Sequence, residues 1–159
     1  MFKKRWAPKP TVPTFKLVLS DPMSGKARQF EIKDPLAQRF IGLKIGDELD
    51  GVILKDLIEL PKGAKIRITG GSGIEGAPMH PGVPGPVKKY ILADGPPGYW
   101  PPKKGMKKKK LVRGNTISDS IVQINAVIVY PKDYTGPPAI PLGAKELEKE
   151  KKAEEAPAQ

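Results

Sequence analysis

The residues best suited to chemistry in this chain are basic and aromatic, and they are gathered in one stretch, GYWPPKKGMKKKKLVRGNTISD, residues 98–119. Between Tyr99 and Gly114 there are seven basic residues and no acidic one. A lysine ammonium is a point charge on a flexible stem, so it binds phosphate groups with little readout of sequence. The stretch therefore indicates a surface for a phosphate backbone.

Three local features distinguish this run from a solvated charged tail. The run is internal, with prolines before it and a strand-like segment after it. Tyr99 and Trp100 lie between prolines, and their rings either stack on unpaired bases or pack over the end of the folded domain. Arg113 suits a bidentate phosphate contact, and Gly114 would let the backbone approach a ribose or phosphate closely.

The net charge of +11 is concentrated in two parts of the chain. Residues 62–114 carry twelve basic and two acidic side chains, and residues 1–16 carry five basic and none acidic. Residues 17–61 instead have eight acidic and six basic side chains. Such a field attracts nucleic acid. No apolar run approaches the roughly 18–20 residues of a membrane span, and no basic amphipathic helix is present, so no membrane partner is predicted.

Two motifs suggest an enzyme, but the neighbouring residues that catalysis would require are missing from both. Gly71–Gly76 satisfies G-x-G-x-x-G, yet the proline-rich residues that follow cannot begin the helix that a dinucleotide site requires. His80 is the single histidine and has no nucleophile or ligand set near it in sequence. The chain also contains no cysteine. We therefore predict no enzyme activity, no cofactor, no metal and no small-molecule substrate.

The elements that must position the basic stretch are mostly strands. Segments of alternating apolar residues or of β-branched residues, bounded by turn residues, predict strands at 14–20, 28–33, 65–69, 87–92, 107–113 and 121–130. Residues 70–76 are predicted to form a tight loop. A helix is predicted between Asp47 and Pro61. Asp47 can cap its N-terminus, apolar residues recur at helical spacing, and Pro61 stops it. The predicted fold is mostly β: a small antiparallel β-barrel with one or two short helices, proline-rich basic loops and a helix-prone C-terminal tail.

Composition divides the chain into three parts. Residues 1–13 are basic and rich in proline, which predicts an extended arm. Residues 14–142 form the predicted β-barrel domain. Residues 143–159 are charged and nearly free of large apolar side chains, which predicts a solvated tail.

Three blocks of the sequence resemble a known family. They are IGDELDG, then KIRITGGSGIEGAPMHPGVPGP, then a basic run followed by VRGNTISDSIVQINAVIV. In this order, over roughly residues 14–130, they resemble the S-six-e family of small-subunit ribosomal proteins of archaea and eukaryotes. The long basic C-terminal helix of eukaryotic members has no counterpart, which points to an archaeal type. His80 and Ala77 depart from the family pattern as well, so a phosphate contact at His80 is not carried over.

The resemblance implies a non-enzymatic, cytoplasmic constituent of the small ribosomal subunit that binds rRNA and supports subunit assembly and translation. Its partners would be small-subunit rRNA and neighbouring ribosomal proteins. The rRNA-binding residues predicted from the resemblance and the charge pattern together are Lys88, Lys89, Tyr99, Trp100, Lys103, Lys104, Lys107, Lys108, Lys109, Lys110, Arg113, Gly114 and Asn115. The alternative is a free RNA-binding translation factor or RNA chaperone with a small β-barrel, and a third hypothesis is an enzyme that uses the glycine loop.

Overall fold

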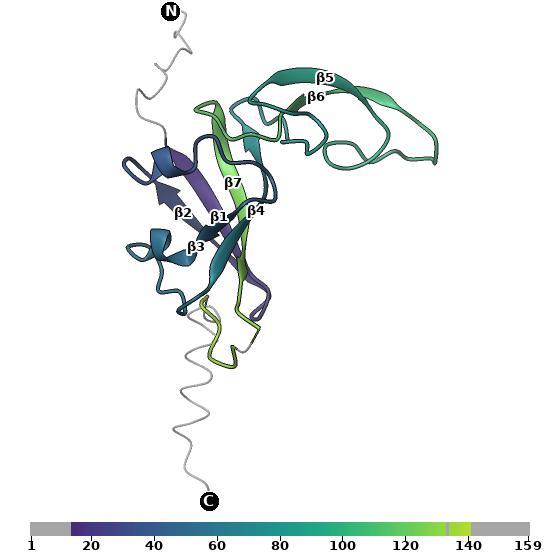
Figure 1. The fold of residues 1–159 in the computed structure, drawn as a ribbon. Coiled ribbons are helices and arrows are strands. Elements are labelled where there is room, and N and C mark those ends of the chain that lie inside the picture. The colour runs from purple at the N-terminus through teal and green to yellow at the C-terminus, as the bar shows by residue number, and fades with distance from the viewer. Residues whose placement is uncertain (1–13, 133, 141–159) are drawn as a thin grey trace, which may run out of the picture.

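The computed structural model describes residues 14–132 and 134–140 (Figure 1). The predicted arm, residues 1–13, and the predicted tail, residues 143–159, lie outside these residues. The described chain is mostly β, as predicted. None of its helices has the length and apolar character needed to cross a membrane.

Strands account for most of the regular structure. They are β1 (Phe15–Asp21), β2 (Lys26–Ile32), β3 (Glu48–Asp50), β4 (Lys65–Gly73), β5 (Lys88–Ala93), β6 (Lys108–Arg113) and β7 (Ile121–Val129). Two short 3-10 helices, η1 (Ala37–Arg39) and η2 (Gly51–Leu54), lie between β2 and β4. All six predicted strands are confirmed to within a few residues, and β3 is additional.

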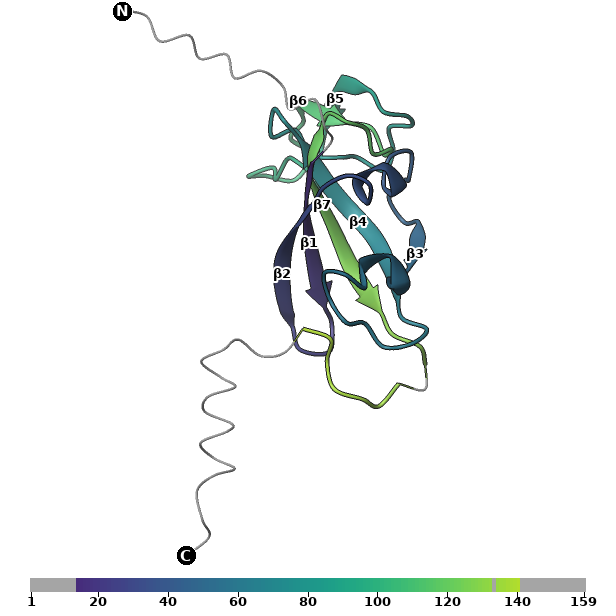
Figure 2. The ribbon, with the colours of Figure 1, turned by 90° about the vertical axis from the view of Figure 1, so that its left-hand side faces the viewer.

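Five of the strands form one mixed sheet in the order β2-β1-β7-β4-β3 (Figure 2). β1 pairs with β7 in parallel, whereas the other three pairings are antiparallel. The remaining two strands, β5 and β6, pair with each other as a separate two-stranded sheet.

The core lies on one face of the five-stranded sheet. Leu17 and Leu19 in β1, and Ile124 in β7, are fully buried and alternate with more exposed positions. This period of two is what places one row of side chains on a single face of each strand. The segment between β2 and β4 covers that face with Phe40 and Leu54, which are also fully buried.

The predicted helix between Asp47 and Pro61 is wrong. Residues 48–50 pair with β4 instead, and only the four residues of η2 are helical. The amide of Gly51 donates to the Ala64 carbonyl at 2.9 Å, and a Cβ at Gly51 would lie 2.7 Å from the same oxygen. Val52, part of the predicted apolar stripe, is 77% exposed. Tertiary pairing therefore overrides the helical spacing here.

The predicted closed barrel is not found in the described residues. β2 and β3 stand at the two edges of an open sheet, and the pairing of β1 with β7 is parallel rather than antiparallel. β5 and β6 do not join that sheet to close it. The predicted glycine loop also differs, because β4 continues to Gly73 and stays paired with β7 through two register irregularities.

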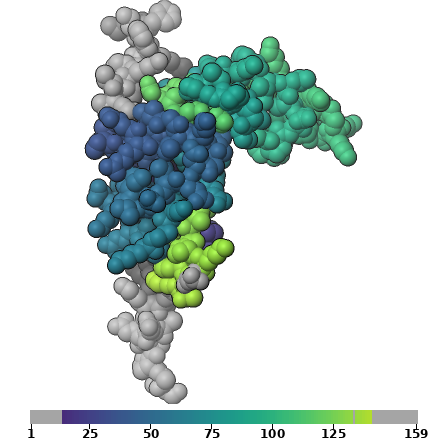
Figure 3. All heavy atoms as spheres, viewed as in Figure 1, coloured from purple at the N-terminus to yellow at the C-terminus, as the bar shows by residue number. Residues whose placement is uncertain are grey.

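The β5–β6 unit, residues 88–113, projects sideways from the sheet and is called the basic hairpin below. Figures 1 and 3 show it reaching away from the body, with the connection between its strands forming the far end. An isolated bridge between Met79 and Arg113 joins its base to the glycine-rich segment. The fold thus displays the lysine run on an ordered hairpin.

Candidate nucleic-acid interface

The basic hairpin carries nine basic residues and one acidic residue, Asp94. Most of its lysine side chains are exposed, and Lys110 is half-buried. Two lysine ammonium groups lie over tyrosine rings: Lys109 is 5.3 Å from the centroid of Tyr90, and Lys110 is 5.8 Å from that of Tyr99. The hairpin therefore presents positive charge together with aromatic side chains.

The connection between β5 and β6 holds the two predicted aromatic residues differently. Tyr99 is half-buried, whereas Trp100 is 74% exposed. Just before them, Gly98 has φ of 89°, and a Cβ there would lie 2.8 Å from Cγ of Pro78. This close approach ties the connection to the body of the protein. Trp100, by contrast, keeps most of its surface in contact with solvent.

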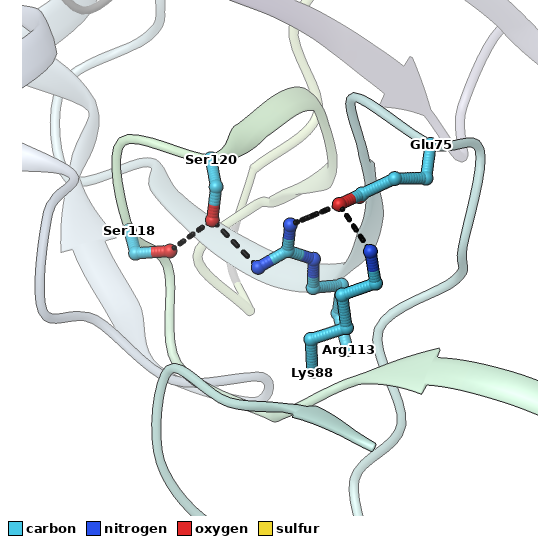
Figure 4. Close-up of polar contacts among 5 residues, drawn as sticks. All are labelled: Glu75, Lys88, Arg113, Ser118 and Ser120. Carbon is cyan, nitrogen blue, oxygen red and sulfur yellow. Dashed lines mark hydrogen bonds and ion pairs between the residues drawn. The ribbon is translucent and has the colours of Figure 1, made fainter. Parts of the chain in front are cut away.

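Arg113 lies at the base of the hairpin and is engaged within the protein. It is 8% exposed, and its Nη2 donates to both carboxylate oxygens of Glu75, at 2.8 and 2.9 Å. Its Nη1 donates to Oγ of Ser120 at 2.7 Å. Figure 4 shows Glu75 between this guanidinium and the ammonium of Lys88, which donates to Glu75 Oε1 at 3.0 Å. We call Glu75, Lys88, Arg113 and Ser120 the hairpin anchor.

The anchor is electrostatically strong. Hydrogen bonds from Arg113, followed by that from Lys88, lower the pKa of Glu75 from 4.5 to about 2. The carboxylate is therefore ionised throughout the physiological range. Because Nη2 reaches both carboxylate oxygens of Glu75 while Nη1 binds Ser120, Arg113 holds the base of the hairpin against the loop after β4 and the segment before β7.

Gly114 and Asn115 have intramolecular partners as well. A Cβ on Gly114 would collide with the backbone carbonyl of Gly85, and the Gly114 amide donates to Val87 O at 2.8 Å. Asn115 Oδ1 accepts from the Gly85 amide at 3.2 Å. The chain's own proline-rich segment therefore approaches Gly114 closely, and the predicted approach to a ribose or phosphate stays a prediction.

Sequence reasoning missed Glu75 and Ser120. A usable signal was present for Glu75, since it and Asp94 are the two acidic residues within 62–114. An isolated carboxylate in a strongly basic segment is well suited to pair with one buried arginine. No comparable pattern distinguishes Ser120 from other serines.

The two residues considered for enzymatic chemistry have structural contacts. Gly71 lies in β4, where a Cβ would collide with the carbonyl of Gln123 in β7. His80 donates its backbone amide to Arg113 O at 2.8 Å, and its Nδ1 accepts from the Gly82 amide at 3.1 Å. In the described residues, no helix follows Gly76 before β5. Gly71 therefore serves the close packing of β4 against β7.

These features define a class: a small, strongly basic, mostly β protein whose charge is carried on a projecting, anchored hairpin. Comparison with known proteins identifies the family. The family model for ribosomal protein S6e matches residues 15–136, and the chain belongs to this family.

Curated relatives agree with this assignment. The chain is 99% identical over 148 residues to the small ribosomal subunit protein eS6 of Pyrobaculum aerophilum, a match covering 93% of this chain and 100% of the relative. It is 88% identical over 144 residues to that of Pyrobaculum islandicum, covering 91% and 97%. The eS6 protein of Caldivirga maquilingensis is 58% identical over 144 residues, covering 91% and 96%.

Proposed function

We propose that this chain is a non-enzymatic structural constituent of the cytoplasmic small ribosomal subunit, and that its basic hairpin binds rRNA during subunit assembly and in translation. Membership of a ribosomal family supports the first part. The observation that carries the second is the display of the lysine run on an anchored hairpin. Its other partners would be neighbouring ribosomal proteins.

The geometry divides the predicted rRNA-binding residues into two groups. The contacts to phosphate are assigned to exposed or half-exposed lysines outside the anchor, namely Lys89, Lys103, Lys104, Lys107, Lys108, Lys109 and Lys110. Tyr99 and Trp100 remain proposed contacts beside them. Lys88, Arg113, Gly114 and Asn115 are assigned the role of holding the hairpin, because their polar groups or backbone are already engaged.

An RNA-binding measurement tests the phosphate contacts. If about seven phosphates are neutralised, log K falls against log salt with a slope of about −5 to −6. Replacing Lys107–Lys110 with alanine should make this slope about 3 less steep, since four contacts are lost. The matched control replaces four exposed lysines of the body, Lys16, Lys33, Lys55 and Lys62, and removes the same net charge. Equal effects of the two quadruple variants would refute a localised site.

Sedimentation tests the ribosomal assignment. Lysate of the source cells is run through a sucrose gradient with a high-salt wash, and this protein is quantified against small-subunit rRNA. About one copy per small subunit, retained through the wash, is expected of a structural constituent. Salt-labile and substoichiometric protein would instead indicate the free translation factor or RNA chaperone.

A further inference from the structure

The two faces of the basic hairpin differ in what covers them. Residues directly opposite in an antiparallel pair share a face. The register therefore places six residues on one face, which we call the tyrosine face: Lys88, Tyr90, Leu92, Lys109, Leu111 and Arg113. On the other face Ala93 and Val112 are buried, at 5% and 0% exposure.

The tyrosine face is buried at its base, where Arg113 lies, and is open to solvent at Tyr90 and Leu92. Tyr90 is 59% exposed and Leu92 is 66% exposed, and the two are neighbours on one face because they are two residues apart in β5. Apolar side chains that lie side by side on a protruding element mark an interaction surface rather than chance exposure.

The charges around this apolar pair select the class of partner. Lys109 lies opposite Leu92 and holds its ammonium 5.3 Å from the Tyr90 ring centroid. Lys88, on the other side of Tyr90, is held by Glu75. The partner must therefore offer a flat apolar surface with a negative charge beside it. An unpaired nucleotide has this combination, since its base carries a π-face and its phosphate is anionic.

We propose that the tyrosine face is a stacking platform for an unpaired RNA base. The base lies on the Tyr90 ring, Leu92 extends the apolar floor, and the Lys109 ammonium moves from the ring to a phosphate of the bound segment. This inference rests on the proposed function, because it takes RNA as the partner. It adds that the hairpin binds a loop, bulge or other single-stranded segment, because the base faces of a duplex are hidden in its own stack.

Fluorescence anisotropy of the full chain tests the platform, with a labelled 12-nucleotide single-stranded RNA of mixed sequence and the blunt duplex of the same sequence. Stacking on an aromatic side chain contributes roughly 5- to 150-fold per base. We expect Tyr90→Leu to weaken binding of the single strand about tenfold and Tyr90→Phe to bind within about twofold of the unsubstituted protein. Duplex binding and the salt slope should be unchanged in both variants. Val52→Ala, at a residue 77% exposed on the body, is the control for loss of exposed apolar surface.

The outcomes separate this inference from the proposed function. If Tyr90→Leu binds the single strand as well as the unsubstituted protein while the Lys107–Lys110 variant loses affinity, the lysines bind RNA and the platform is overturned. Equal weakening for single strand and duplex overturns it too, because the tyrosine would then support the hairpin's shape or a protein contact. If neither variant alters binding and the salt response is flat, the rRNA-binding function itself fails.

Discussion

Replacement of Glu75 by glutamine is the sharpest test of the hairpin anchor. The substitution keeps the shape of the side chain but removes the charge that pairs with Arg113, a residue 8% exposed. Arg113 Nη2 now donates to both carboxylate oxygens, and hydrogen bonds to charged groups contribute about 1.5–3 kcal/mol each. The amide oxygen of glutamine can accept from Nη2, but its NH₂ group cannot, so the variant is expected to be destabilised.

The magnitude follows from the pKa of Glu75. A pKa lowered from 4.5 to about 2 corresponds to roughly 3 kcal/mol at most. The Glu75 side chain is 32% exposed, so solvent screening reduces this to about 1–2 kcal/mol. Because the folded-state pKa is the lower one, this stabilisation is fully present above the unfolded pKa of about 4.5 and is lost as pH falls toward 2.

Urea unfolding followed by circular dichroism measures the effect at pH 7 and at pH 2.5, in low salt. At pH 7 Glu75→Gln should unfold with about 1–2 kcal/mol less free energy than the unsubstituted protein. At pH 2.5 most of this difference should vanish, because the carboxyl of the unfolded chain is then protonated and must lose its proton on folding. Lys88→Ala is the control, since Lys88 is 46% exposed and its ion pair is worth less than about 1 kcal/mol. A difference for Glu75→Gln that is the same at both pH values would refute the reasoning.

Two further predictions concern a backbone contact and the partly buried Tyr130. Gly114→Ala should reduce the free energy of unfolding by about 2–3 kcal/mol, because its Cβ would collide with the carbonyl of Gly85. Gly70→Ala is the control, because a Cβ there meets no atom within 4 Å. Its free energy of unfolding in urea should fall by less than about 1 kcal/mol. Equal losses in the two variants would contradict the role of the close approach at Gly114. Burial, assisted by the nearby Asp21, raises the pKa of Tyr130 to about 12. Ultraviolet titration should therefore show one phenol ionising well above pH 10. Because the folded-state pKa is the higher one, the stability that the neutral phenol contributes is lost as pH rises from about 10 to about 12. Ionisation of every tyrosine near pH 10 would contradict that burial.

Local sequence patterns predicted the strands well because a strand's signal is local. A strand with one face toward the core shows its pattern within a few neighbouring residues. This is the case for the alternation in residues 14–20 and the β-branched run at 121–130, which lie in the sheet as β1 and β7. The helix predicted from Asp47 failed for the opposite reason. Its apolar spacing is compatible with a helix, but the pairing of residues 48–50 with β4 decided the outcome.

The candidate site shows the same division. The lysines at 103, 104 and 107–110 were predicted to bind rRNA; all but the half-buried Lys110 are exposed, and their contact with RNA stays a prediction. Arg113 looked like one more member of the run, yet it is buried against Glu75, which is 38 residues earlier in the chain. No local pattern specifies that pairing, because it depends on how the glycine-rich end of β4 and the base of the hairpin meet.

The sequence by itself determined the family, the mostly β character and the place where positive charge gathers, since composition, alternation and contiguous motifs are properties of neighbouring residues. Only the tertiary structure decided that the sheet stays open, that Gly114 packs against the carbonyl of Gly85, and which side of the hairpin exposes Tyr90. Each of these depends on strand order or register. A shift of one residue in register turns every side chain to the other face, so contacts between distant residues are set by the assembled sheet.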